Sequence, residues 1–184
     1  MIDPALVSLR SETLDRRRED AAFQQATAEW IEASCRHGYS YHFDWLGRPI
    51  IQYPQDMVAL QEILWEVRPR VVVECGIAHG GSLVLVASML ALIDQCEAVE
   101  RGEEWLSLTS TDITSKVVGV DVDIRGHNRR AIEAHPLSGR IHLVEGSSTD
   151  AAVIDRVVEE VGDRSPVVVL LDSNHAAGHV RDEL

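Results

Sequence analysis

Apolar residues in this chain fall into short continuous runs that are separated by stretches with helical spacing. Four runs rich in β-branched residues occupy residues 71–73, 117–120, 141–144 and 167–171. Each run is apolar on both faces, which is typical of parallel strands covered by helices. Between them, helical spacing marks residues 82–93, 128–134 and 150–161. This alternation predicts an α/β fold, a Rossmann-like doubly wound parallel sheet.

The first third of the chain has a different pattern. Residues 4–36 are charged, Ala-rich and loosely amphipathic, which predicts a helical region. Residues 39–54 combine aromatics with prolines and a glycine and predict an irregular, ordered arm, which either packs against the domain or forms one wall of a substrate site. A helix follows and stops before Pro69. We therefore expect an N-terminal helical region and arm at residues 1–55 and a cofactor-binding domain at 56–184.

Two features depart from a complete sheet of this type. Residues 97–116 form a long polar excursion, which is either a surface insertion with a short helix or a functional loop. The sequence also stops soon after the fourth run, so we expect the sheet to lack its C-terminal strands. The fourth strand would then expose an apolar edge. We expect a homo-oligomer that forms through this edge or through the N-terminal region.

Composition narrows the class of partner. The formal net charge is −13 and the pI is about 4.9, which argues against nucleic acid or an anionic membrane surface as the main partner. The three cysteines have no metal-ligand spacing, and no secretory signal precedes them. No continuous apolar run reaches the roughly 18 residues of a membrane span. These features predict a cytoplasmic protein with reduced thiols and no membrane span.

The segment after the first run, ECGIAHGGS at residues 74–82, has the composition of a cofactor-binding turn. Gly76 would let the chain turn off the strand, and Gly80 and Gly81 would let the backbone approach a ligand. The glycine spacing is not that of a dinucleotide fold, and Glu74 would oppose a pyrophosphate but suit an ammonium or sulfonium group. This favours S-adenosylmethionine over a nicotinamide cofactor, so a nicotinamide-dependent oxidoreductase is a disfavoured alternative. The expected cofactor-binding residues here are Glu74, Gly76, His79, Gly80, Gly81 and Ser82.

Polar residues also follow the second and third runs. Asp121 ends the second run, where a carboxylate can accept hydrogen bonds from ribose hydroxyls, or else act as a turn or helix-capping residue. We prefer Asp121 to Asp123 for the ribose. Ser147 and Ser148 follow the third run and could line an adenine edge, or belong to the N-cap of the helix at Asp150.

The fourth run ends in Asp172, with His175 three residues later. This pair places an oxygen ligand suited to Mg²⁺ or Ca²⁺ beside a titratable base, although a capping turn would use the same residues. His175 and His179 have a zinc-like spacing, but the glutamate of a zinc-protease motif is missing, so zinc is disfavoured. Because the carboxyl ends of parallel strands share one edge, we expect Asp172 beside the glycine-rich turn.

Several segments together resemble one known family. They are ECGIAHGGSL, VVGVDVDIRGHNRRAIEAHPLSGRI, EGSSTD and LLDSNH, with WLGRPIIQYPQDM upstream. Between about residues 45 and 175, the chain resembles the cephalosporin hydroxylase family. That resemblance implies a class I S-adenosylmethionine-dependent methyltransferase fold. It also implies kinship with rhamnosyl O-methyltransferases and with sugar O-methyltransferases of antibiotic pathways.

The resemblance also implies roles for single residues. Glu74 and Gly76 would contact the methionine end of S-adenosylmethionine, and Asp121 would hold the ribose. Ser148 would lie near the adenine.

By the same resemblance, Asp172 would be a magnesium ligand and His175 the general base for methyl transfer to a small-molecule hydroxyl. A sugar, a phenol or a β-lactam intermediate all fit that acceptor. Further acidic metal ligands would come from a following strand that these 184 residues do not include. A truncated, catalytically silent domain that binds cofactor or self-associates is therefore the alternative.

Overall fold

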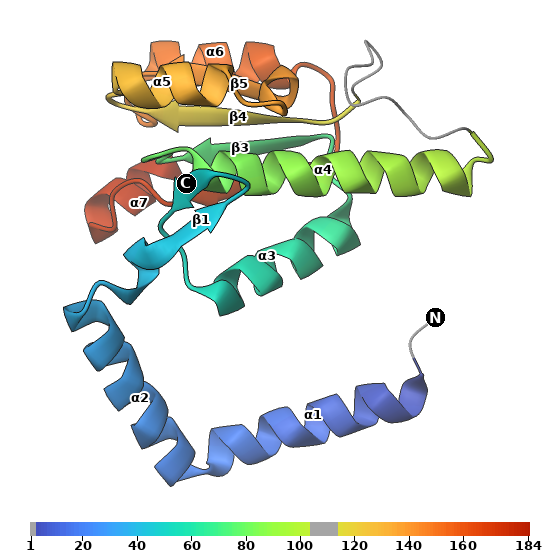
Figure 1. Ribbon diagram of the computed structural model, residues 1–184, viewed down its shortest axis with the longest axis vertical. Coiled ribbons are helices and arrows are strands. Elements are labelled where there is room, and N and C mark those ends of the chain that lie inside the picture. Colours follow the sequence, from blue (N-terminus) through green and yellow to red (C-terminus); the bar gives the residue numbers. More distant parts are fainter. Residues whose placement is uncertain (1–2, 104–113) are drawn as a thin grey trace. The chain divides into compact units, whose positions relative to one another are not determined.

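The computed structural model describes residues 3–103 and 114–184, which form two compact units that divide after Ser40 (Figure 1). The first unit contains helices α1 (Pro4–Glu19) and α2 (Ala21–Arg36). The predicted helical region is thus two helices, because Asp20 leaves helical geometry and caps α2 by accepting a hydrogen bond from the Phe23 amide. The predicted boundary at residue 55 lies later than the division observed after Ser40.

The second unit is built on a four-stranded parallel sheet. Its strands are β3 (Val71–Cys75), β4 (Lys116–Asp121), β5 (Ile141–Glu145) and β6 (Val167–Leu171), in the order β5-β4-β3-β6. Each predicted run is a strand. The chain order reverses at β3, because β4 lies on one side of it and β6 on the other. The switch point at which such sheets bind ligands therefore lies at the carboxyl ends of β3 and β6.

Helices cover both faces of this sheet. They are α3 (Pro54–Val67), α4 (Gly81–Glu100), α5 (Gly126–Glu133), α6 (Ala151–Val161) and α7 (Ala177–Glu183). One core cluster joins Val72 to side chains of α3, α4 and α5, and the other joins Val71 and Val73 to Val153 of α6. Successive β3 side chains thus enter opposite core layers, as expected of a strand buried on both faces. The predicted α/β fold class, a Rossmann-like parallel sheet, is confirmed.

The arm at residues 39–54 is more regular than its composition predicted. It contains a 3₁₀ turn (Tyr39–His42) and an antiparallel hairpin of β1 (Phe43–Trp45) and β2 (Arg48–Ile50). Leu46 and Gly47 form the turn with φ angles of 46° and 83°. The prediction of an irregular arm was wrong because leucine is unusual at a positive φ. The turn therefore lacks the Asn-Gly or Asp-Gly pair that usually marks a two-residue hairpin. Trp45 Nε1 donates to Ser88 Oγ over 3.1 Å, which attaches the hairpin to α4 within the second unit.

Helix α4 continues to Glu100, well beyond the predicted end at residue 93. The extension carries a buried charge, since Asp94 accepts hydrogen bonds from Arg140 and from Ser115. In the sequence, a polar residue that is buried in an ion pair cannot be distinguished from a solvent-exposed one. The pattern of apolar residues therefore did not predict this extension of the helix. Of the predicted excursion, residues 104–113 lie outside the described residues.

By length and composition α4 could also cross a membrane, since its mean hydropathy is 1.7 over the most apolar window. In this fold 61% of that window is buried inside the protein, as the central helix of the core.

The N-terminus of α4 lies against the hairpin. A Cβ atom on Gly81 would come within 2.2 Å of the Pro49 carbonyl oxygen, and one on Gly80 within 2.4 Å of the Ile132 side chain. The sequence suggested that these glycines make room for a ligand. Both glycines are therefore needed for packing against protein atoms. Gly81 also lines a cavity beside the turn, and the contact of both residues with a cofactor stays a prediction.

We predict that Gly81→Ala lowers the free energy of unfolding by roughly 2 kcal/mol, because the added methyl group meets backbone that cannot move alone. Gly178→Ala is the matched control, since its Cβ would meet nothing within 4 Å in α7. The control should leave stability unchanged or slightly raised. Urea unfolding followed by tryptophan fluorescence measures both. Equal stabilities for the two variants would contradict this account.

Candidate functional site

Three strand ends meet around Gly76. Its amide donates to the Val120 carbonyl over 2.8 Å, and the next amide, of Ile77, donates to Asp121 Oδ2 over 3.0 Å. Gly76 has a φ of +90°, and a Cβ there would lie 2.3 Å from the carbonyl oxygen of Asp172. Only glycine permits both the turn and this approach. The turn after β3 therefore touches the ends of β4 and β6, which brings three of the predicted segments together.

Two cavities flank Gly76. The turn cavity, of about 320 Å³, is lined by residues of the glycine-rich turn together with Asp121, Asp172 and His175. The serine cavity, of about 300 Å³, shares Gly76 and Asp121 with it. It also shares Ser173, and its other walls include Gly146, Ser147, Ser148 and His179. The two cavities therefore adjoin at Gly76, Asp121 and Ser173.

Backbone amides fix the position of Asp121. Oδ2 accepts from Ile77, and Oδ1 accepts from the Asp123 amide over 3.1 Å. Each carboxylate oxygen keeps a further lone pair that can accept from a ligand hydroxyl. The Asp123 side chain is exposed and does not line either cavity. Asp121 is thus the carboxylate that both cavities present to a ligand.

Two residues that the sequence reasoning missed hold the glycine-rich turn in place. Arg48 of β2 donates through Nε to the His79 carbonyl over 3.1 Å, and Asn128 of α5 donates to the Ala78 carbonyl over 2.9 Å. Ala78 has a φ of 43°, which is unfavourable for a residue with a Cβ, so these bonds stabilise a strained turn. Both residues lie in segments that carry the family resemblance, but spacing alone gave them no chemistry.

Glu74 is buried, with 1% of its surface exposed. Ser82 Oγ donates to its Oε1, while Oε2 is buried with no hydrogen-bond partner among the described residues. Burial raises the pKa of Glu74 to about 8, the Ser82 hydrogen bond opposes this, and the charge of Asp172 adds to it. The carboxyl is therefore mostly protonated at neutral pH. A nearby cation would favour its ionised form.

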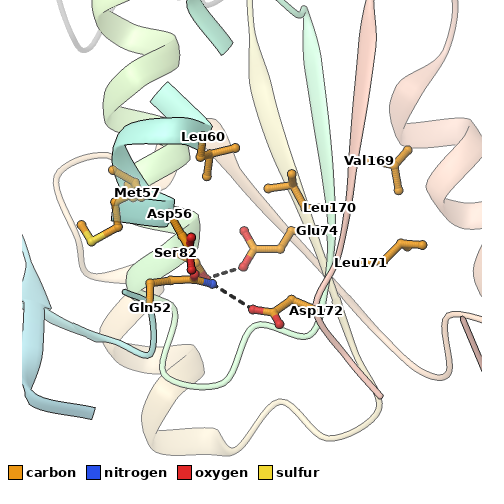
Figure 2. Close-up of a pocket in the computed structure, with 11 residues that line it drawn as sticks. Gln52, Asp56, Met57, Leu60, Glu74, Ser82, Val169, Leu170, Leu171 and Asp172 are labelled. Carbon is orange, nitrogen blue, oxygen red and sulfur yellow. Dashed lines mark hydrogen bonds between the residues drawn. The ribbon is translucent and has the colours of Figure 1, made fainter. Parts of the chain in front are cut away.

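Figure 2 shows Glu74 and Asp172 on the side of the sheet that faces α3. Here a further cavity, the α3 cavity, of about 300 Å³, combines these acids with apolar walls from Met57, Leu60 and Leu170. It shares Ser82 and Asp172 with the turn cavity. The acidic end of this apolar cavity thus opens beside the glycine-rich turn.

Asp172 and His175 lie together, as the sequence predicted from their spacing. Asp172 Oδ2 accepts from Gln52 over 2.9 Å, and Oδ1 lies 3.6 Å from His175 Nε2. Burial raises the pKa of Asp172, while His175 and the Gln52 hydrogen bond oppose the rise. The His175 side chain is 79% exposed, so its ring can approach a substrate in the turn cavity.

Metal binding at Asp172 stays a prediction. Among residues 3–103 and 114–184, no three histidine, cysteine or acidic side chains are grouped as metal ligands. The Asp172 carboxylate instead contacts an amide and an imidazole. The described residues do not by themselves form a magnesium site, and we derive no step through one.

The two serines of the loop after β5 are not the N-cap of α6. Asp150 has that role, because its Oδ1 accepts from the Ala152 amide over 2.8 Å. Ser147 and Ser148 line the serine cavity instead. Ser148 donates over 2.6 Å to Glu183 of α7, another residue that the sequence reasoning missed.

These features define an α/β protein with cavities at the switch point of its parallel sheet. The family described as Rhamnosyl O-methyltransferase/CmcI matches residues 37–184, and the chain belongs to this family. The resemblance found in the sequence is confirmed. The rhamnosyl O-methyltransferases of Mycobacterium tuberculosis and Mycobacterium bovis are 30% identical over 131 residues, which is 70% of this chain and 44% of theirs. The chain thus spans less than half the length of these curated relatives.

The chain is also similar to solved structures, of which the first below agrees on the fold. A structure of CmcI with Mg and SAM has a TM-score of 0.50 and 20% identity, and the match covers 77% of this chain and 50% of that one. A TDP-rhamnose 3'-O-methyltransferase of calicheamicin biosynthesis has a TM-score of 0.45 and 18% identity, with 64% and 49% covered.

The raised pKa of Glu74 predicts a pH-dependent stability. Between pH 4.5, where the unfolded carboxyl ionises, and about 8, the folded state keeps a proton that the unfolded state has lost. Stability conferred by this residue is therefore greatest at low pH and decreases through that window. We predict that Glu74→Gln abolishes this decrease in stability with rising pH. Above pH 8 the variant should be more stable than the natural protein by on the order of 3 kcal/mol.

Urea unfolding at pH 5 and pH 9 measures this difference. Glu159→Gln, at an exposed position of α6, is the control and should follow the natural protein at both pH values. A stability difference between Glu74→Gln and the natural protein that is the same at both pH values would show that Glu74 ionises normally.

Proposed function

We propose that this chain is the cofactor-binding region of an S-adenosylmethionine-dependent O-methyltransferase that acts on a small-molecule hydroxyl. Glu74 carries the proposal. A buried carboxyl with one unpartnered oxygen beside the glycine-rich turn suits an ammonium or sulfonium group, because a cation favours its ionised form, whereas an anionic pyrophosphate opposes that form. This supports S-adenosylmethionine over a nicotinamide cofactor.

The residues around the two cavities fit such a cofactor. Gly76 provides a surface without a side chain, and Glu74, in the adjoining α3 cavity, offers a carboxyl for the cationic methionine end. The amide-held Asp121 would accept from the ribose hydroxyls, and Ser147 and Ser148 would line the adenine. His79 and Ser82 complete the turn cavity. When bound, S-adenosylmethionine supplies a methyl group from its sulfonium sulfur. The leaving group is the neutral thioether S-adenosylhomocysteine.

The chain's own residues would prepare the acceptor. His175 would take the proton of the acceptor hydroxyl at Nε2 as the new C–O bond forms and the S–C bond breaks. Asp172 lies 3.6 Å from that nitrogen and would stabilise the imidazolium that results. A sugar-like acceptor is supported by the names of the curated relatives.

Self-association is a second proposal. Val169 of β6 is 56% exposed, and among the described residues β6 pairs only with β3. An unpaired apolar strand edge favours association with another chain. This supports a homo-oligomer, and it would also suit a domain that binds cofactor without turnover.

We predict that the chain binds S-adenosylhomocysteine and that Asp121→Asn weakens the binding roughly 10- to 100-fold, because the amide loses a charge-assisted acceptor for the ribose. Asp123→Asn is the matched control, since its exposed side chain lines neither cavity. Isothermal titration calorimetry gives both dissociation constants. If the natural chain gives no binding heat, the proposal that it binds this cofactor is wrong. If both variants lose the same affinity, the proposed role of Asp121 is wrong.

We predict that His175→Ala reduces methyl transfer at least about 100-fold while cofactor affinity changes less than about twofold, since the ring acts on the acceptor. His127→Ala, at an exposed position of α5, is the control and should keep full turnover. Transfer of labelled methyl groups to simple rhamnosides measures the rate. Full turnover by His175→Ala would exclude His175 as the base, and any turnover by the natural chain would exclude the silent-domain alternative.

A further inference from the structure

The Glu183 side chain of α7 is buried beside the serine cavity, with only 2% of it exposed. Its Oε1 accepts from Ser148 Oγ over 2.6 Å and from Ser173 Oγ over 2.7 Å. Oε2 is buried without a hydrogen-bond partner among the described residues. A buried carboxylate thus takes hydrogen bonds from two serines that belong to different loops, and both serines line the cavity.

The direction of these bonds follows from the chemistry of the groups. An ionised carboxylate can only accept, and each serine hydroxyl has one proton. The hydrogen bonds of Ser148, Ser173 and His179 hold the pKa of Glu183 below its usual range, although burial alone would raise it. Both serine protons therefore point at Glu183. The Oγ atoms keep only lone pairs for anything else.

His179 does not change this assignment. Its Nε2 lies 3.4 Å from Ser148 Oγ and 3.2 Å from Ser173 Oγ, longer than the bonds of both serines to Glu183. With the serine protons on Glu183, Nε2 carries a hydrogen and donates, to Glu183 Oε1 at 3.2 Å among others. The imidazole therefore also offers no acceptor to the network.

We propose that Glu183 determines which purine base the serine cavity accepts. Because it takes the protons of Ser148 and Ser173, these hydroxyls present only acceptors to the cavity, so the wall that they form favours a base edge that donates. The 6-amino group of adenine donates, whereas the 6-oxo group of hypoxanthine or guanine would face oxygen lone pairs. Glu183 acts through the serines and is a positioning residue. The inference rests on the proposed S-adenosylmethionine site.

The test is calorimetric titration of the full chain with S-adenosylhomocysteine and with S-inosylhomocysteine, which carries a 6-oxo group. The natural chain should prefer the adenosyl compound roughly 10- to 100-fold, because the oxo group loses a hydrogen bond and meets an acceptor. In Glu183→Gln the amide nitrogen can donate to the serines and release their protons toward the cavity. The preference should then decrease at least about fivefold.

Glu159→Gln on α6 is the matched control and should keep the natural preference. A purely structural role of Glu183 would weaken both ligands equally, so an unchanged ratio in Glu183→Gln overturns the inference and leaves the cofactor site intact. If neither ligand binds the natural chain, the proposed function fails, and the inference fails with it.

Circular dichroism will show whether Glu183→Gln folds. If it does not, Ser148→Ala is the second variant, because it removes one of the two acceptors and keeps the carboxylate. The adenosyl preference should again decrease, and a preference equal to that of the natural chain would overturn the inference.

Discussion

The close approach of the β3 turn to the end of β6 at Gly76 is the constraint on which the site depends. A Cβ at this position would lie 2.3 Å from the Asp172 carbonyl oxygen, so only glycine allows the two strand ends to meet. The same residue turns at a positive φ and bonds to the end of β4 through its amide. Because Gly76 has no side chain, the ends of three strands can meet at this point. Asp121 and Asp172 therefore line the same cavity, the turn cavity.

The turn is held rigid from outside the sheet. Arg48 of the hairpin and Asn128 of α5 bond to consecutive carbonyls of the turn. Gly80 and Gly81 let Ile132 and the hairpin backbone approach closely. The two glycines that the sequence suggested as ligand contacts therefore have a packing role, and Gly81 also lines the turn cavity. A site of this kind needs such support, because misplacement by about 1 Å is costly in binding and catalysis.

The strands and the strand-end chemistry could be predicted from the sequence because both depend on local patterns. Continuous aliphatic runs indicate buried strands, and the switch-point rule then places Asp121 and Asp172 at one edge. What could not be predicted depends on contacts between distant residues. From the sequence Asp94 is expected at an exposed position, but in the structure it is buried and paired with Arg140. For this reason α4 was predicted too short. Glu183 lies 35 residues from Ser148, and no spacing rule links them.

Charge at this site is controlled by the surroundings of each acid. Glu74 is buried with one serine donor, so its pKa is raised and it is mostly protonated at neutral pH. A cation beside it would favour the ionised form. Asp121 is held by two backbone amides and keeps acceptor capacity for hydroxyls. Glu183 is surrounded by hydroxyl and imidazole donors, which favour its ionised form and fix the direction of their hydrogen bonds. The three acids also differ in place, because Glu74 lines the α3 cavity, Asp121 lines the turn and serine cavities, and Glu183 contacts a serine of the serine cavity. This order of charge and hydrogen-bonding capacity matches the ligand proposed above.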